Sequence, residues 1–393
     1  MKRRRFLQGL GTVSVVVAGG TVWRATDQGV FAVGTGPAYE PWTTWRDTDN
    51  EGPLALVRAG ILAANPHNTQ PWMFRVSEEG VELYADRSRH LGSFDPYLRE
   101  MHLGLGCAVE NMMLAARAAG YEPALELVGG QLEPIAGQPG RALVARISLD
   151  QGEVDRDALF EAIPQRHTNR GPYDLGRGLS AALAEELQAV GRSEEAVDVV
   201  LFTEPDSLAQ CRGLITDATE AIIADRPMVH ESERWFRHSW DAIQKYRDGP
   251  TLDAAGLSPL MTGIAKLMPR PSAEANHQYW LDATRDVHVA TAPGFGLIFV
   301  DDLYDRAQAL QAGQVWQRLH LWAATQGLAM QPLNQPVERV DRERQLGLEP
   351  SSARALAALT GERADRPTFA FRVGYPSRQA SASPRRAVEQ VVL

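Results

Sequence analysis

The sequence predicts an α+β protein in which two related domains each combine helices with an antiparallel or mixed sheet. The main observation is an internal repeat: residues 106–120 and 313–327 align without gaps at a constant offset of 207, and each segment runs between two glycines. Strand-like stretches precede and follow both segments, so the order strand, helix, strand occurs twice. The length of 393 residues leaves room for two domains of ordinary size.

The individual elements follow from apolar periodicity. Residues 53–64 form a helix-like run that ends in a polar turn. Apolar residues on most faces of the segments 106–120 and 313–327 predict buried helices that end at a C-terminal glycine. Short runs rich in branched and aromatic residues predict strands at 73–76, 81–85, 142–147, 295–300 and 368–373.

We expect the first domain to span residues 31–150 and the second to span residues 151–393. The two are unequal, because the second carries extra length at about 226–276. Aromatic residues are mixed there with Gly and Pro, which indicates short helices. An insertion of this size is either a lid over a site or a plain surface excursion.

Residues 1–30 are expected to be a signal or tether. Lys2 to Arg5 are followed by Phe6 and Leu7, and then by a weakly apolar stretch at 9–22 that is too short to span a bilayer. This pattern resembles a twin-arginine export signal, whose export machinery would be a transient partner. The small residues at 18–20 permit cleavage, and retention as an uncleaved tether stays open. We therefore expect an exported, periplasmic or membrane-tethered protein rather than a cytoplasmic one.

Composition excludes several classes of protein. Hydrophobic residues make up 44% and charged residues 23% of the chain, which is typical of a globular protein and argues against disorder and a membrane bundle. The net charge of -9 disfavours broad binding to nucleic acid. Two cysteines, Cys107 and Cys211, cannot build a disulfide scaffold or a four-cysteine zinc site, and a single bridge between them stays open.

Three polar clusters carry the candidate chemistry. The first is the turn Pro66-His67-Asn68-Thr69-Gln70, which is dense in amide and imidazole groups. In the second, Arg166-His167-Thr168-Asn169-Arg170, two guanidinium groups flank a hydroxyl, a combination that suits a phosphate. The third is the pair Arg385-Arg386 after the last predicted strand. Each cluster also has a plain structural interpretation, as a capped turn, a solvated basic loop or a basic tail.

Taken in order, these motifs resemble the flavin-binding nitroreductase family: an Asn-x-Gln-Pro-Trp turn, an Arg-x-Thr-x-Arg segment, a Gly-Leu-x-x-x-Pro loop at 327–332 and a terminal Arg-Arg pair. The duplication resembles the two-domain Acg branch of that family. The resemblance covers the chain from about residue 50 to its end. It implies two fused nitroreductase-like α+β domains related by a pseudo-two-fold axis, a single-chain mimic of the family dimer, with FMN at their interface.

The resemblance also implies roles for individual residues. Arg166 and Thr168, with His167 in the same segment, would hold the phosphate and ribityl chain of FMN, and Arg170 would approach the pyrimidine edge of the flavin ring. The first domain would contribute Pro66, His67, Asn68 and Gln70. The loop residues Pro332, Leu333 and Asn334 would lie near the flavin N5, and Arg385 or Arg386 would return to the phosphate.

The chain departs from the family pattern in one respect. It has no Arg-x-Ser/Thr-x-Arg segment before the first domain and no second His-Asn-x-Gln-Pro-Trp turn. Only one of the two pseudo-symmetric sites therefore has both halves, and we expect one FMN per chain.

These inferences predict an FMN-dependent oxidoreductase that passes electrons from NAD(P)H or another small-molecule donor to a nitroaromatic or quinone-like acceptor. The flavin carries the chemistry, so no side chain is named as a catalytic acid or base. The alternative is a protein that sequesters or stores FMN beneath the lid at 226–276. A metal-dependent hydrolase built on His67, His167 and His230 is disfavoured, and no metal is expected, because no close metal-ligand spacing accompanies these residues. The sequence leaves further homo-oligomerisation open.

Overall fold

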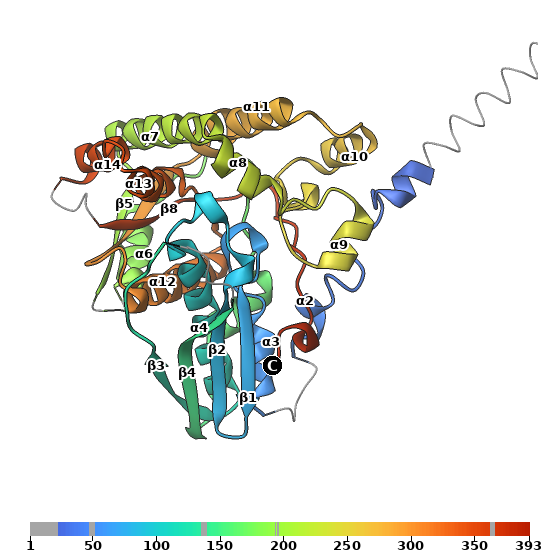
Figure 1. Ribbon diagram of the computed structural model, residues 1–393, viewed down its shortest axis with the longest axis vertical. Helices are drawn as coiled ribbons and strands as arrows, with labels where there is room; N and C mark the ends of the chain where they lie inside the picture. Colours follow the sequence, from blue (N-terminus) through green and yellow to red (C-terminus); the bar gives the residue numbers. More distant parts are fainter. Residues whose placement is uncertain (1–22, 47–51, 135–139, 193, 195, 362–365) are drawn as a thin grey trace, which may run out of the picture.

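The computed structural model describes residues 23–46, 52–134, 140–192, 194, 196–361 and 366–393. The described chain forms two four-stranded antiparallel sheets with helices packed between and around them (Figure 1). The strand order is β1-β2-β4-β3 in the first sheet and β5-β6-β8-β7 in the second. The α+β class is confirmed, and the sheets are antiparallel rather than mixed.

The first sheet comprises β1 (Trp72–Ser77), β2 (Gly80–Asp86), β3 (Tyr121–Leu127) and β4 (Arg141–Gln151). Phe74 of β1 lies opposite Leu83 of β2, and Leu83 lies opposite Ala145 of β4. These three side chains are buried in one core, whereas Glu82 on the other face of β2 pairs with the exposed Arg146. The alternation of buried and charged positions is the reason this sheet is covered on one face only.

The second sheet comprises β5 (Val197–Phe202), β6 (Gly294–Val300), β7 (Ala329–Pro332) and β8 (Pro367–Gly374), and the two central strands are buried throughout. On one face, Leu297 and Ala370 pack with Val337 of α13 (Gln335–Leu346) and Leu356 of α14 (Ser351–Thr360). On the other face, Phe369 contacts Trp316 with ring centroids 4.6 Å apart. Helices therefore cover both faces of this sheet, which explains its continuous apolar strands.

The two long helices of the sequence repeat, α4 (Arg99–Ala118) and α12 (Arg306–Thr325), pack against each other. Their contact is centred on Gly106 and Gly313, whose Cα atoms come so close that a Cβ on Gly106 would lie 1.9 Å from the Leu310 carbonyl oxygen. A Cβ on Gly313 would lie 2.0 Å from the Leu103 carbonyl oxygen. The predicted C-terminal glycines are confirmed, because Gly120 and Gly327 follow the last helical turns with φ angles of +83° and +69°. The helices begin earlier than the repeat, at Arg99 and Arg306, so Gly106 and Gly313 lie inside them, where only glycine permits this approach.

Polar side chains flank the glycine contact. Arg318 of α12 donates two hydrogen bonds of 2.7 Å to Glu110 of α4, and Gln317 donates one of 2.8 Å to Asn111. The Asn111 amide in turn donates to the Ala59 carbonyl in α3 (Leu54–Gly60). These four side chains therefore satisfy one another's hydrogen bonds, and their network ties α3, α4 and α12 together.

The C-terminal tail returns to the first sheet. The Phe74 amide donates to the Val391 carbonyl at 2.8 Å, and the Leu393 amide donates to the Phe74 carbonyl at 2.8 Å, which places the tail beside β1. This pairing covers the free edge of β1. It also carries Arg385 and Arg386 across to the turn that precedes β1.

The insertion at 226–276 follows α7 (Pro205–Ala224) and contains α8 (Arg226–Glu233), α9 (Trp240–Tyr246) and α10 (Pro259–Leu267), with α11 (Ala273–Ala283) at its end. Asp225, Ser239, Ser258 and Ser272 each accept a hydrogen bond at the start of one of these helices, which is why the helices begin there. Figure 1 shows the insertion along the upper and right-hand part of the molecule.

The remaining helical elements are short connectors. They are α2 (Pro41–Thr44), η1 (Pro66–Asn68), η2 (Arg87–Arg89), η3 (Gly92–Phe94), α5 (Ala158–Ala162), η4 (Ile163–Gln165), α6 (Ala181–Gly191), η5 (Leu252–Ala254), η6 (Thr284–Val289) and η8 (Val388–Gln390).

Both cysteines are free and buried, so the bridge between Cys107 and Cys211 that the sequence left open does not form. Within the described part of the chain, no helix has the length and apolar character needed to cross a bilayer.

Substituting Gly106→Ala should lower the free energy of unfolding by about 1–3 kcal/mol, because the added methyl group forces α4 and α12 apart. Urea denaturation measures this change. Gly213→Ala is the matched control: Gly213 also lies inside a helix, α7, and nothing lies within 4 Å of its Cβ position. The control should leave stability unchanged or raise it by up to about 1 kcal/mol through helix propensity. Equal effects of the two substitutions would contradict the importance of the glycine contact.

Candidate functional site

The turn between α3 and β1 holds three residues in the left-handed region of the backbone. The φ angle is +46° at His67, +51° at Asn68 and +50° at Gln70. Such angles cost about 1–3 kcal/mol for residues other than glycine and persist only where the surroundings fix them. Here the Gln70 amide donates to the Asn65 side chain at 2.8 Å and closes the turn on itself, while Pro66 packs against Gly104 of α4. The turn therefore presents its side chains in fixed directions.

Asn68 connects this turn to two distant segments. Its side-chain amide donates to the Pro384 carbonyl at 2.9 Å and to the Gly249 carbonyl at 3.3 Å. Its side-chain oxygen accepts a hydrogen bond from Arg385. A single buried amide thus joins the first domain to the insertion and to the C-terminal tail.

Gln70 makes a parallel set of contacts. The side-chain amide nitrogen of Gln70 donates to the Arg247 carbonyl at 2.8 Å, and the side-chain oxygen accepts from the Arg386 backbone amide at 2.8 Å. The Arg386 guanidinium donates to the Gln70 carbonyl at 3.1 Å. The first and third predicted motifs therefore meet in the structure, and Arg247–Gly249 of the insertion covers them.

Arg166 and Arg385 form a buried cationic pair, with 2% and 3% of their surfaces exposed. Both guanidinium groups donate to the Leu62 carbonyl, at 3.0 Å and 3.4 Å. The Nε atom of each is buried without a hydrogen-bond partner, and within the described residues neither pairs with a carboxylate. Burial lowers the pKa of Arg166 to about 10, and burial together with the charge of Arg166 lowers the pKa of Arg385. Two buried like charges without a counter-ion are costly, so this pair is suited to an anion.

The segment Ala38–Trp42 packs against the cationic pair. The Trp42 indole donates to the Ser383 carbonyl at 2.7 Å, and its ring centroid lies 4.7 Å from the Arg385 guanidinium carbon and 4.6 Å from the His167 ring centroid. Burial, and then the charges of Arg166 and Arg385, lower the pKa of His167 to about 3. His167 is therefore neutral at physiological pH and adds no further positive charge beside this pair.

His67 and Arg170 bring the first and second motifs together at another point. Nε2 of His67 lies 2.7 Å from the Ser232 hydroxyl oxygen in α8. Burial and the charge of Arg170 lower the pKa of His67 to about 4. Arg170 donates to the Ala254 carbonyl at 3.2 Å, and the half-buried Thr168 lies two residues before it. The insertion thus contacts both motifs, through Ser232 and Ala254.

The loop residues Pro332, Leu333 and Asn334 serve the packing of the second sheet. Leu333 is fully buried beside Phe295, and Pro332 is half-buried at the end of β7. Asn334 uses both ends of its amide: it donates to Glu100 at 2.7 Å and accepts from the Ala370 amide at 2.8 Å. Among the described contacts, none links these three residues to the cationic pair.

Glu100 belongs to a buried carboxyl cluster that the sequence analysis missed. Burial, and then the charge of Glu100, raise the pKa of Asp95 to about 7, and burial beside Glu100 raises the pKa of Glu338. Nearby, Arg99 and Asp341 form an ion pair of 2.7 Å. The cluster joins α4 to α13, and burial raises the pKa of each of its three carboxyl groups. No motif marks it, because its members are scattered along the sequence.

Three further residues of the site were also missed. Trp42 lies in a stretch without a motif, and Cys107 and His320 lie inside the repeat helices, where they look like ordinary core positions. Burial and the charge of Arg166 lower the pKa of His320. Burial raises the pKa of the Cys107 thiol, and the charge of Arg166 opposes that rise. Both helices therefore flank the cationic pair.

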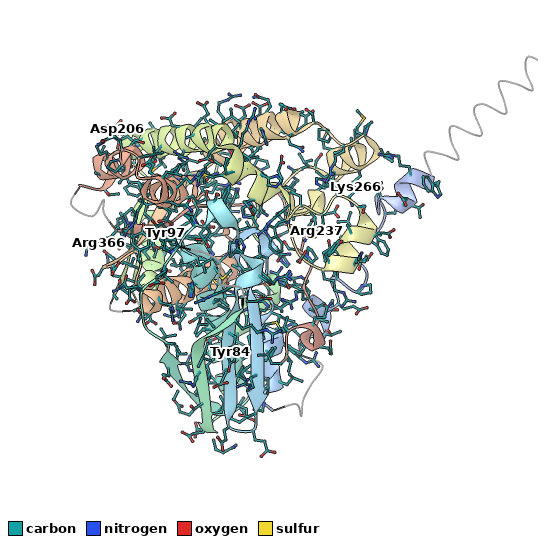
Figure 2. All side chains as sticks on the ribbon, viewed as in Figure 1. Tyr84, Tyr97, Asp206, Arg237, Lys266 and Arg366 are labelled. Atoms are coloured by element: carbon teal, nitrogen blue, oxygen red, sulfur yellow. The ribbon has the colours of Figure 1, made fainter. Side chains whose placement is uncertain are left out.

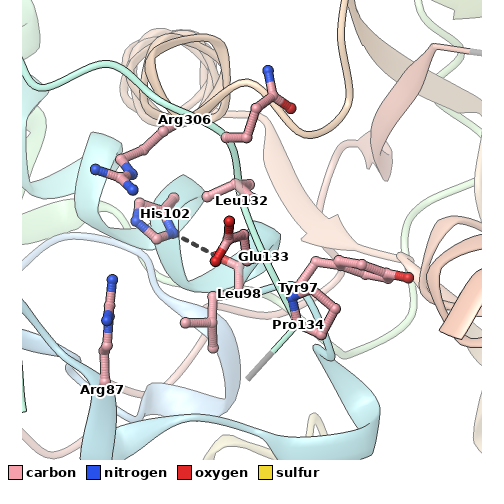
Figure 3. A pocket seen from close by; sticks show the side chains of 9 residues that line it. Arg87, Tyr97, Leu98, His102, Leu132, Glu133, Pro134 and Arg306 are labelled. Carbon is pink, nitrogen blue, oxygen red and sulfur yellow. Dashed lines mark hydrogen bonds between the residues drawn. The ribbon is translucent and has the colours of Figure 1, made fainter. Parts of the chain in front are cut away.

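Two cavities were found among the described residues. The larger, of about 330 Å³, is shown in Figure 3, where Arg87 and Arg306 approach it from either side of His102. The smaller, of about 140 Å³, lies between α2 and η8 and is lined by Pro41 and Val388. Neither is lined by the predicted cofactor residues. Among the described residues, no group of three or more His, Cys, Asp and Glu is arranged to hold a metal ion.

Substituting His167→Phe should weaken the dependence of stability on pH. The folded pKa of about 3 lies below the unfolded value of about 6.5, so the unfolded chain binds the extra proton and stability is lost as pH falls below about 6.5. Between pH 6.5 and 5 the wild type should lose about 1.5 kcal/mol more unfolding free energy than the variant, whose phenyl ring retains the contact with Trp42. Denaturant titrations at both pH values measure the difference. Identical losses would show that His167 is not held neutral.

No family model matches the chain. The sequence is 24% identical over 353 residues to "Putative NAD(P)H nitroreductase Rv3131" of Mycobacterium tuberculosis strain H37Rv, a match that covers 88% of this chain and 92% of that protein. It is 23% identical over 348 residues to "Putative NAD(P)H nitroreductase acg" of the same strain, covering 86% and 94%.

Solved nitroreductase structures align less extensively. The FMN-dependent nitroreductase NfnB from Mycobacterium smegmatis in complex with NADPH aligns with a TM-score of 0.36 and 14% identity, covering 59% of this chain and 96% of that one. NfnB from Sphigopyxis sp. strain HMH, described as FMN- and NADPH-dependent, gives 0.37 and 15%, covering 60% and 97%. The sequence relatives support an oxidoreductase enzyme, and over most of its length the chain is similar to the mycobacterial proteins named as NAD(P)H nitroreductases.

Proposed function

We propose that the chain is an FMN-dependent oxidoreductase of the nitroreductase type. The observation that carries this proposal is the buried pair Arg166 and Arg385, which has no counter-ion among the described residues and two unpartnered Nε–H groups. A guanidinium fork matches the oxygens of a phosphate, and a dianion supplies the charge that the pair lacks.

The surrounding residues fit the rest of FMN. Asn68 and Gln70 lie beside Arg385 and Arg386, and Arg170 lies on the side of His67, so the cofactor would be held by both domains. Thr168 and His167 belong to the same segment as Arg166. When bound, FMN supplies hydride acceptance and electron transfer to an acceptor. The chain itself binds, orients and encloses the cofactor, and Arg170 provides a positive charge in the site.

The sequence relatives point to the reaction partners. Both mycobacterial proteins carry names that specify NAD(P)H and a nitro compound. We assign the same classes to this chain: a reduced nicotinamide as electron donor and a nitroaromatic or quinone-like acceptor. Both are small molecules, so the reaction needs no macromolecular partner.

We also propose that the chain arose by duplication. α4 and α12 have equal lengths of 20 residues, and the two sheets have the same strand order. At the offset of 207, Glu110 corresponds to Gln317 and Asn111 to Arg318, so the contacts Glu110–Arg318 and Asn111–Gln317 are equivalent under a two-fold axis through Gly106 and Gly313. Such reciprocal contacts are the signature of an isologous interface.

We also propose that the protein is exported. The twin-arginine pattern at residues 2–7 lies outside the described residues, so its assignment rests on the sequence. A protein that folds around FMN before export would reach the periplasm, or stay tethered to the membrane, with its cofactor in place.

The alternative function is sequestration of FMN, and one observation favours it. Arg247 and Gly249 contact Gln70 and Asn68 directly, so the insertion covers the proposed cofactor site. The buried Asp248 between them forms an ion pair with Arg89 and another, of 2.6 Å, with Arg237. A cover fixed in this way would protect bound flavin from other molecules.

Arg166→Ala should weaken FMN binding by roughly ten- to a hundredfold, because the phosphate loses a charge-assisted contact worth about 1.5–3 kcal/mol. Riboflavin, which lacks the phosphate, should bind wild type and variant with similar affinity. Titration of the cofactor-free chain, followed by flavin fluorescence, measures both constants. Arg354→Ala, which removes an exposed arginine paired with Glu349, is the control and should change neither. An unchanged FMN constant in Arg166→Ala would refute the phosphate assignment.

Anaerobic mixing of the FMN-loaded chain with NADPH separates the two functions. Rapid bleaching of the flavin absorbance in the wild type supports the enzyme. Bleaching that occurs only in Asp248→Asn, where the ion pairs of the insertion are weakened, supports sequestration. Asp206→Asn is the matched control, because Asp206 is exposed at the start of α7, far from the insertion's ion pairs (Figure 2). Stopped-flow absorbance records the rates.

A further inference from the structure

Helix α10 in the insertion buries polar side chains and exposes apolar ones, the reverse of an ordinary surface helix. Its buried residues are the polar Thr262 and Lys266, with 7% and 8% of their surfaces exposed. The large apolar side chains of this segment point outward: Leu260 is 73%, Met261 51%, Ile264 45% and Met268 60% exposed. Leu260, Met261 and Ile264 follow helical spacing, and Met268 extends the stripe just past the end of the helix. A helix normally buries such a stripe, so this one is built for an apolar partner outside the chain.

The inverted orientation is fixed by specific contacts. Lys266 forms an ion pair of 2.7 Å with Asp253 and donates to the Gly29 carbonyl at 3.1 Å. Arg24 donates to the carbonyls of Leu267 at 2.9 Å and Met268 at 3.0 Å, where helix α10 ends. Figure 2 labels Lys266 where α10 meets the N-terminal segment. Because the polar residues are held on the inside, α10 cannot turn its apolar stripe inward.

The N-terminal segment adds two large exposed side chains beside this helix. Trp23, next to Arg24, is 69% exposed, and Phe31, next to Val30, is 81% exposed. Val30 lies within 3.5 Å of the Cβ position of Gly263 in α10. We call the four outward residues of α10, together with Trp23 and Phe31, the α10 face.

We infer that the α10 face rests on the surface of an anionic lipid bilayer. The chain that precedes Trp23 supports this occupant: residues 9–22 are largely apolar, residues 2–5 are Lys-Arg-Arg-Arg, and this stretch joins the structure at the α10 face. In the sequence, Arg24 follows Trp23, and Arg270 comes two residues after Met268. Aromatic and apolar residues beside basic ones are typical of a membrane interface. Basic residues near the surface are attracted to anionic headgroups.

A second copy of the chain is a poorer occupant. Stable protein interfaces use about 20–30 residues on each side, whereas the α10 face offers six large apolar residues on a short helix and a neighbouring segment. A shallow lipid contact needs only a narrow apolar stripe with basic residues at its border. The inference concerns where the protein sits and is independent of the proposed chemistry.

The test measures binding of the full chain to vesicles of phosphatidylcholine and phosphatidylglycerol in equal amounts. The triple variant Leu260→Ser, Ile264→Ser, Met268→Ser should reduce the partition coefficient by at least about tenfold, because it removes most of the apolar stripe. The matched control, Leu346→Ser with Leu348→Ser, removes two exposed leucines at the end of α13 and should have no effect. Circular dichroism verifies that both variants are folded.

A second measurement separates α10 from the N-terminal sequence, which can bind vesicles by itself. An environment-sensitive fluorophore is attached to Leu260→Cys or to Leu348→Cys; both native cysteines are buried. Emission should shift to the blue on vesicle addition only at position 260. Equal partition of the triple variant with no shift at position 260 would overturn the inference. A shift without vesicles that grows with protein concentration, together with dimers in the ultracentrifuge, would assign the face to a second copy instead.

Discussion

The contact between Gly106 and Gly313 determines where the rest of the site can form. Because neither residue has a Cβ, the backbones of α4 and α12 approach until a carbonyl of each helix occupies the space of a missing side chain on the other. Arg166 lies against both helices, with Cys107 of α4 and His320 of α12 as its electrostatic neighbours. The first sheet packs on α4 and the second sheet packs on α12, so the position of one sheet relative to the other depends on the same contact.

The burial of Arg166 and Arg385 explains why so many backbone carbonyls converge on one place. The carbonyls of Leu62, Ala63 and Pro384 all accept hydrogen bonds from these guanidinium groups. Carbonyl dipoles reduce the cost of burying a cation but carry no net charge. The two positive charges therefore stay uncompensated, and the fold keeps them buried by surrounding them with Trp42, the strained turn and the C-terminal tail. Under the proposed function, a bound phosphate would compensate these charges and would stabilise the folded protein by mass action.

Much of this architecture could be predicted from the sequence, and the failures have physical reasons. Continuous apolar residues predict strands such as 295–300. The family resemblance implies that Asn68 and Arg385 or Arg386 serve one cofactor, but their direct contact required the structure, since the residues are distant in the chain. The C-terminal glycines of α4 and α12 follow from the pattern, whereas the extension of both helices upstream of Gly106 and Gly313 does not, because sequence alone does not distinguish a helix end from a close approach. Trp42 and the buried cluster around Glu100 depend on tertiary contacts that leave no local pattern. The apolar spacing in α10 is the same whether a helix faces inward or outward, so its exposed stripe required the structure.

The cover over the strained turn has a consequence for how long a bound molecule stays. Arg247–Gly249 hydrogen-bonds Asn68 and Gln70, and Asp248 is held by two arginines, so several interactions must break together before the site opens. Dissociation would then be limited by opening of the protein rather than by the affinity of individual contacts. Under the proposed function, a flavin enclosed in this way would behave as a prosthetic group that stays through many reaction cycles. A protein exported with its flavin would need this property, because free flavin is diluted outside the cytoplasm.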